Sequence, residues 1–254
     1  LVTVASGMAA MGKIPFCSSY AMFSPGRNWE QIRTTIAYNN ANVKVVGSHA
    51  GVSVGPDGGT HQALEDIALM RVLPRMTVIA PCDAIEAKKA TLALAKHVGP
   101  AYLRLTREKT PVITTLDTPF EIGKANLLVD TECPRVALVS CGSLVYNTLM
   151  AAKQLQEEGI ETLVLNLHTI KPMDTEAILD VARRAGKVVT IEEHQVAGGM
   201  GSVVAEFLAE NYPVPMRFIG VRDQFGQSGT PEELVAYYGM DVASIVKITK
   251  SFLH

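Results

Sequence analysis

The sequence predicts two doubly wound α/β domains joined by a short linker, and three observations predict this class. Short apolar, β-branched runs alternate with segments of helical periodicity, the alternation stops once between residues 110 and 119, and a second series of the same kind follows. A chain of 254 residues that is 48% hydrophobic can bury one large core or two modest ones. We therefore expect domains at 1–115 and 116–254.

In the first domain, short apolar runs predict buried strands of a parallel sheet at 43–48, 77–81 and 101–105. Apolar residues at helical spacing or a capping residue predict the helices that cover this sheet, at 29–38, at 61–73 and, after the N-cap Asp83, at 84–97. Two prolines and four threonines then break the periodicity at 110–119, where we place the linker.

The second domain repeats the alternation from residue 135 onward. Its predicted strands are at 135–143, 161–167, 187–194 and 216–221. Its predicted helices are at 148–159, after the N-cap Asp174, at 203–212, and near Pro231 and Asp241. In a doubly wound sheet, the loops at the carboxyl ends of the strands are the expected ligand positions.

Composition excludes several classes of protein. The chain has 23 basic and 25 acidic residues and a net charge of -2, so we expect neither nucleic acid nor an anionic membrane as a partner. No apolar run approaches the roughly 20 residues of a membrane helix. Four cysteines without a CxxC pair predict reduced thiols of a cytoplasmic protein and no metal site. The chain opens at Leu1, inside an apolar stretch, so we expect a segment upstream of it.

The stretch 48–62, SHAGVSVGPDGGTHQ, combines glycines with His49, Asp57 and His61. Glycines let the backbone approach a ligand closely. Thr60 is placed to cap the predicted helix, with His61 at its positive end, where a neutral imidazole suits acid/base chemistry. His49 follows a predicted strand at the carboxyl end of the sheet. A glycine-rich turn with solvated histidines is the alternative, and no metal-ligand or Ser-His-Asp spacing is present.

Two further groups of residues stand near predicted strand ends. Tyr20 and Phe23 indicate either a flat face for a heterocycle or core packing. Arg107 follows the strand at 101–105, where a guanidinium suits a phosphate or carboxylate, although surface arginines are common in such loops. Glu192, Glu193 and His194 form an acidic cluster to which the sequence assigns no role.

Six segments resemble, in order, the carboxyl-terminal section of a transketolase: VASGMAAMGKIPF, SYAMF, SHAGVSVGPDGGTHQ, TVIAPCDAIEA, LRLTR and IEEHQVAGGMG. The resemblance covers almost the whole chain and implies a pyrimidine-binding domain of a thiamine-diphosphate enzyme followed by a transketolase carboxyl-terminal domain. It implies transfer of a two-carbon ketol unit between sugar phosphates, as in the pentose phosphate pathway. It also implies the roles of six residues: the aminopyrimidine would contact Tyr20 and Phe23, the sugars would face His49, Asp57 and His61, and the acceptor phosphate would meet Arg107.

The resemblance further implies a split enzyme. A separate amino-terminal subunit would hold the diphosphate and Mg²⁺, in a homodimer or heterotetramer, and the chain alone would be inactive. The family's GDG…Asn magnesium motif has no match here, and the glutamate that activates the aminopyrimidine is expected upstream of Leu1. Pro56 stands where the family often has an acidic residue.

Three alternatives stay open at this point. A 1-deoxyxylulose-5-phosphate synthase and a 2-oxo-acid dehydrogenase β subunit share the two-domain layout, but the segments GRNWEQIR and SHAG favour the split transketolase. A non-catalytic scaffold that keeps this fold is the third.

Overall fold

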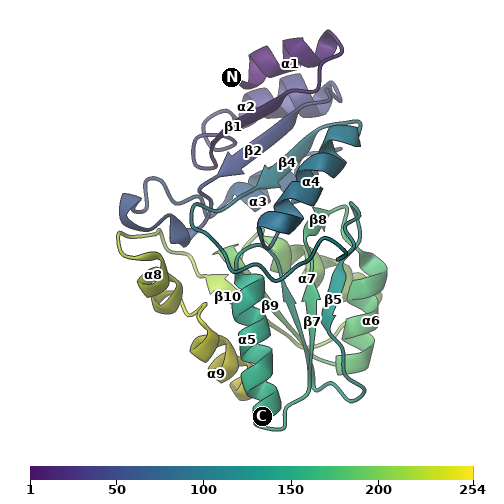
Figure 1. Cartoon of the computed structure of the whole chain (residues 1–254), viewed down its shortest axis with the longest axis vertical. Coiled ribbons are helices and arrows are strands. Elements are labelled where there is room, and N and C mark those ends of the chain that lie inside the picture. The colour runs from purple at the N-terminus through teal and green to yellow at the C-terminus, as the bar shows by residue number, and fades with distance from the viewer. Residues whose placement is uncertain (254) are drawn as a thin grey trace.

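Two five-stranded sheets with flanking helices make up the computed structural model, which describes residues 1–253. The sheets follow one another along the long axis of the molecule, with α1 near one end and the chain's C-terminus at the other (Figure 1). The first has strand order β1-β2-β4-β3-β8 and the second β10-β9-β6-β7-β5. The predicted class of two α/β domains is confirmed.

Parallel pairing joins β1, β2, β4 and β3 of the first sheet. The strands are β1 Phe16–Tyr20, β2 Lys44–Ser48, β3 Thr77–Ile79 and β4 Ala101–Arg104. The helical elements are α1 Val2–Ala10, α2 Trp29–Gln31 with its π-helical continuation η1 Ile32–Tyr38, the 3-10 segment η2 Val52–Asp57, α3 Asp66–Arg71 and α4 Ala84–Lys96. Asp83 caps α4 as predicted, because its Oδ1 accepts the Glu86 N–H at 2.8 Å.

The second sheet is built from β5 Asn126–Val129, β6 Val136–Ser140, β7 Thr162–Asn166, β9 Val188–Gln195 and β10 Met216–Val221. The helices of this domain are α5 Leu144–Glu157, α6 Thr175–Ala185, α7 Met200–Asn211, α8 Pro231–Tyr237 and α9 Val242–Leu253. Asp174 caps α6, and Thr230 caps α8 together with Glu233. Every predicted strand and helix of the second domain is present.

Alternating side chains of β6 show why helices cover both faces of this sheet. Ala137 and Val139 belong to a cluster with residues of α6 and α7, whereas Val136 and Leu138 belong to another with residues of α5, α8 and α9. Because successive side chains of a strand point to opposite faces, an apolar run such as VALV has to be buried on both sides.

The two domains interlock through β8, Thr169–Lys171, which the sequence did not predict. This strand comes from the second half of the chain but pairs antiparallel with β3 of the first sheet. One hydrophobic cluster also runs from the first domain into the second through Leu167 and Ile170. The linker at 110–119 has no regular structure, as predicted. Residues 1–253 contain no helix that is long and apolar enough to cross a membrane.

The predicted helix at 61–73 is wrong at its start. The α-helix begins at Asp66, and residues 59–61 form a turn in which the His61 N–H donates to Gly58 O at 2.9 Å. The chain is extended at Ala63, which forms an isolated parallel bridge with Ala50. This contact with the glycine loop replaces the first helical turns, so His61 does not lie at the positive end of a helix.

Candidate active site

The ends of β1 and β2 bring two predicted residues into contact. Tyr20 is the last residue of β1 and lies beside Ser48, the last residue of β2, so His49 follows directly at the same edge of the sheet. The Tyr20 and His49 rings stack with centroids 3.9 Å apart and planes 11° apart. His49 has φ of +54°, a backbone conformation rare for this residue type and often found at functional sites.

Phe23 and His61 extend this contact into a cluster of four rings. The centroid of Phe23 lies 5.4 Å from that of His61, with the rings nearly perpendicular, and 6.2 Å from that of Tyr20. All four side chains are partly exposed. The resemblance assigned Tyr20 and Phe23 to the cofactor and the two histidines to the sugars, and the structure brings all four side chains together.

Asp57 and Arg107 form an ion pair near these rings. Arg107 Nη1 lies 3.0 Å from Asp57 Oδ1 and donates to Val54 O at 2.7 Å. The side chains of Arg107 and Asp57 are 35% and 28% exposed, so solvent screens the pair and it contributes little stability. Pro56 is exposed in the same segment, η2. Both charges act on His49, so the pair lies near that residue.

Electrostatics favour neutral His49. Burial and the nearby Arg107 charge lower the pKa of His49, and Asp57 only partly opposes them. Its Nδ1 lies 3.1 Å from Ser48 Oγ. A neutral imidazole can either donate or accept a proton, as the handling of a sugar hydroxyl or carbonyl requires.

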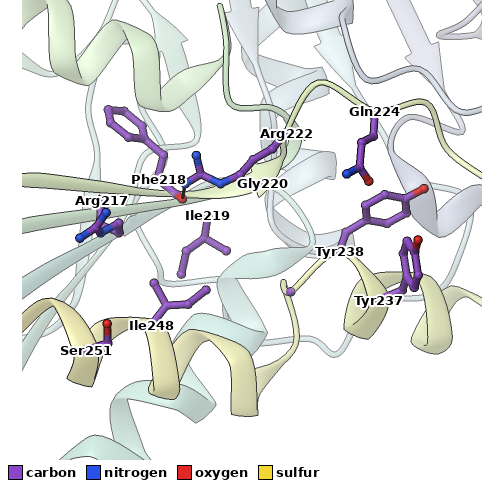
Figure 2. Close-up of a pocket in the computed structure, with 11 residues that line it drawn as sticks. Arg217, Phe218, Ile219, Gly220, Arg222, Gln224, Tyr237, Tyr238, Ile248 and Ser251 are labelled. Atoms are coloured by element: carbon purple, nitrogen blue, oxygen red, sulfur yellow. Dashed lines mark hydrogen bonds between the residues drawn. The ribbon is translucent and has the colours of Figure 1, made fainter.

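Two of the open cavities are considered as binding places for a ring-shaped ligand. One of about 570 Å³ has a mixed lining, with Phe23 and other apolar residues beside polar and charged ones: Ala21, Met22, Gly26, Arg27, Thr60, Ala63, Glu65, Asp66 and Leu69. Figure 2 shows the other, of about 450 Å³, between β10 and the helices α8 and α9. Its two arginines already have partners, since Arg222 donates to Phe218 O and Arg217 lies over the Phe252 ring. No predicted site residue lines this second cavity, so the first is the candidate site.

The glycines of the loop serve a purpose the sequence did not reveal. A Cβ atom on Gly59 would collide with the carbonyl of Gly226, in the second domain. Gln62 Nε2 donates to Val52 O and Gly55 O, and also to Gln227 O at 3.0 Å. The glycines therefore leave room for a segment of the second domain, whereas the sequence indicated that they leave room for a ligand.

A buried polar network between the domains was missed by the sequence analysis. Arg104 Nε lies 2.8 Å from Asp66 Oδ2, which also accepts the Tyr102 hydroxyl at 2.7 Å. Burial acts to raise the pKa of Asp66, but Arg104, with His194 and Tyr102, outweighs it and holds that pKa below its usual range. Arg104 Nη2 donates to Glu193 O, in the second domain. The arginine inside the apolar run AYLRL was the available signal.

The cluster at 192–194 lies in this interface. Glu192 accepts the Met200 and Gly201 N–H groups, so a carboxylate of the protein itself lies at the start of α7. Burial raises the pKa of Glu192 to about 7. His194 is fully buried, which lowers its pKa to about 4.

Comparison with known proteins identifies the class that this fold and site define. The family "Transketolase, pyrimidine binding domain" matches residues 1–112, and "Transketolase, C-terminal domain" matches residues 123–245. The chain belongs to the transketolase family, whose members depend on thiamine diphosphate. These matches favour a transketolase over the synthase, dehydrogenase and scaffold alternatives.

The similar proteins include separate subunits of this family. A putative transketolase C-terminal section of Methanocaldococcus jannaschii is 43% identical over 97% of this chain and 78% of its own length. A 6-deoxy-6-sulfo-D-fructose transketolase subunit SqwH of Clostridium sp. (strain MSTE9) is 42% identical over 97% of this chain and 76% of its own. A solved split-gene transketolase, described as an inactive beta4 tetramer, superimposes with a TM-score of 0.93 at 42% identity and covers 99% of this chain and 80% of that one.

Proposed function

We propose that this chain is the subunit of a split transketolase that binds the aminopyrimidine of thiamine diphosphate and both sugar substrates. One observation carries the proposal: the four rings of Tyr20, Phe23, His49 and His61 lie beside the Arg107–Asp57 pair, at the carboxyl ends of β1, β2 and β4. In the proposed reaction, the C2–C3 bond of a ketose phosphate breaks, and the carbons from C3 onward leave as an aldose phosphate that is two carbons shorter. The two-carbon unit forms a new bond to the aldehyde carbon of an acceptor, with no net oxidation.

The cavity beside Phe23 fits the ring of the cofactor. The Phe23 ring and the apolar part of the lining suit the face of a flat heterocycle, with Tyr20 close by, and the polar part suits its ring nitrogens and amino group. Thiamine diphosphate, when bound, carries the two-carbon unit between the sugars. Residues 1–253 hold no group of three or more His, Cys, Asp or Glu side chains that could bind a metal ion. We therefore assign Mg²⁺ and the diphosphate to a partner subunit.

Each polar residue of the site has a proposed role in substrate binding. The imidazoles of His49 and His61 would form hydrogen bonds with sugar hydroxyls and the carbonyl and would move a proton where needed. Asp57 would accept a hydroxyl hydrogen bond. Arg107 uses Nη1 within the protein, so the other edge of its guanidinium would bind the acceptor phosphate.

The proposed assembly contains this chain and an amino-terminal, diphosphate-binding subunit, in a homodimer or heterotetramer. We propose domains at 1–115 and 116–254, with β8 exchanged into the first sheet. Four free cysteines fit a reducing, cytoplasmic location. The relatives support a subunit role, and the sugar pair of this enzyme is a matter for assay.

The function is tested with this chain and its partner subunit, supplied with thiamine diphosphate and Mg²⁺. Fructose 6-phosphate serves as donor, and glyceraldehyde 3-phosphate or unphosphorylated glyceraldehyde as acceptor. We expect ketol transfer by the mixture and none by this chain alone. Activity of this chain alone, or none from any ketose phosphate with the partner, would contradict the proposal.

Arg107→Ala tests the phosphate assignment in the same assay. Loss of a charge-assisted contact should cost about 1.5–3 kcal/mol, mostly as a higher KM for glyceraldehyde 3-phosphate. The KM for glyceraldehyde should change little. Equal losses on both acceptors would assign Arg107 to the support of the loop through Val54 O.

A further inference from the structure

The carboxylate of Glu193 joins the two domains at the loop that carries Asp57. Glu193 lies near the end of β9 in the second domain and is 2% exposed. Its Oε1 accepts the backbone N–H of Ser53, in η2 of the first domain, at 2.5 Å. Its Oε2 accepts the Ser143 hydroxyl at 2.8 Å. One side chain therefore ties the start of the loop to the second sheet.

The backbone of η2 is held from three directions. Gln62 donates to Val52 O and Gly55 O, and Arg107 donates to Val54 O. Glu193 supplies the acceptor for the Ser53 N–H. Because Ser53 is buried, loss of that acceptor leaves a backbone donor without a partner and favours movement of the loop toward water.

Gly51 shows how closely the carboxylate approaches this loop. Its φ is +89°, and a Cβ atom there would collide with Glu193 Oε1. Two residues before it lies His49, and six after it lies Asp57. The backbone that Glu193 contacts is therefore the short connection between two proposed substrate-binding residues.

We propose that Glu193 is a positioning residue, which acts from the second domain to hold the loop 51–57 so that Asp57 and Arg107 meet the sugar phosphates. This role rests on the proposed function of the site. Substrate-positioning groups must be held within a fraction of an ångström to be effective. Glu193 touches no reacting atom in this proposal, and it acts through the Ser53 N–H.

Glu192 provides a matched control on the same strand. It is buried like Glu193 and also accepts backbone N–H groups, but these belong to α7 of its own domain. Glu192→Ala removes a buried acceptor without touching the loop. Glu193→Gln keeps an oxygen for the Ser53 N–H, whereas Glu193→Ala removes it.

The first measurement is amide hydrogen exchange in the complex with the partner subunit. Glu193→Ala should raise exchange in the segment 50–58 about 10-fold or more, because the Ser53 bond is lost. Glu192→Ala should raise it around 200–203 only, and Glu193→Gln should resemble the native protein. Equal exchange in 50–58 for Glu193→Ala and the native protein, or an equal rise with Glu192→Ala, overturns the proposal. If Glu193→Ala does not accumulate, Glu193→Asp withdraws the oxygens by one carbon and gives the same test.

The second measurement is the kinetics of the loaded enzyme. Glu193→Ala should lower kcat/KM about 10- to 100-fold, chiefly through KM for the sugar phosphates, with Glu193→Gln within a few-fold of native. Glu192→Ala should lower thermal stability yet leave KM unchanged. A loosened loop with native KM and kcat contradicts the positioning role. If the native enzyme shows no ketol transfer, the proposed function is wrong. The exchange result still decides whether Glu193 holds the loop.

Discussion

At the carboxyl end of the first sheet, Tyr20, His49 and Arg107 are partly exposed and surround a site that a ligand can enter. At the carboxyl end of the second sheet, the corresponding polar residues face the first domain. Glu193 accepts the Ser53 N–H, and Asn166, which ends β7, donates to Glu86 of α4 at 2.8 Å. The same edge of the same kind of sheet carries the proposed ligand site in one domain and an interface in the other.

The histidines show the same contrast. His49 and His61 are partly exposed, whereas His168, just after β7, and His194, in β9, are fully buried. The topology of a doubly wound sheet indicates where polar side chains gather. It does not indicate whether water, substrate or another domain meets them, and this depends on what the neighbouring segments cover.

The largest expected effect is the loss of a buried charge partner at the interface. Asp66→Ala leaves the Arg104 guanidinium buried without its carboxylate, which should cost about 3–5 kcal/mol of unfolding free energy. Urea denaturation measures it. Asp57→Ala is the matched change in the exposed pair with Arg107, and we expect a cost below about 1 kcal/mol there. Similar costs for both variants would remove the distinction between the two ends.

We expect acid to destabilise the protein through the buried histidines of the second domain. Burial lowers the pKa of His168 to about 4, so between pH 6.5 and 4 the unfolded chain binds more protons than the folded one. Stability is therefore lost as the pH falls through this range, by up to about 3 kcal/mol from this residue.

The variant His168→Phe isolates that contribution. It keeps a ring stacked on Phe120 but cannot take up a proton. Unfolding free energies measured from pH 7.5 to 4 should fall less steeply for the variant, although His194 still contributes. Parallel curves for variant and native protein would show that His168 takes up its proton as readily in the folded protein as in the unfolded chain.

At the exposed end the expected effect is on turnover instead of stability. His61→Ala should lower kcat about 100-fold, equivalent to about 2.7 kcal/mol, through loss of an acid/base or transition-state contact. Thermal unfolding should change little, because His61 is partly exposed. His97→Ala, at the end of α4, is a histidine control. Native turnover in His61→Ala would make this residue part of the turn alone.

The strands of both sheets that are continuous apolar runs could be predicted, because burial on both faces leaves a clear pattern. Three strands were missed: β1 is FCSSY, with two serines, β5 is a partly buried edge strand of four residues, and β8 has three residues. The helix at 61–73 was predicted too long, since helical spacing in the sequence does not reveal that Ala63 pairs with Ala50. Local patterns cannot report such tertiary contacts.

Four of the six proposed site residues, His49, Asp57, His61 and Arg107, follow strands that the sequence does reveal. Tyr20 ends β1, which was missed, so Tyr20 and Phe23 were found through their aromatic rings and the family resemblance. Glu193 and Asp66 could not be found, since their partners lie 140 and 38 residues away along the chain. The sequence shows such residues as isolated charges near apolar runs. Their charges are explained by tertiary contacts: Asp66 pairs with Arg104 of its own domain, and Glu193 accepts the Ser53 N–H of the other domain.

The strand β8 has a consequence for synthesis of the chain. Until residues 169–171 have left the ribosome, β3 is an unpaired edge with open backbone donors and acceptors. The first sheet can therefore be completed only after the second domain has been synthesised as far as residue 171. A gene that ended at the linker would encode the first family domain without β8. The exposed edge of β3 would then be free to pair with strands of other molecules.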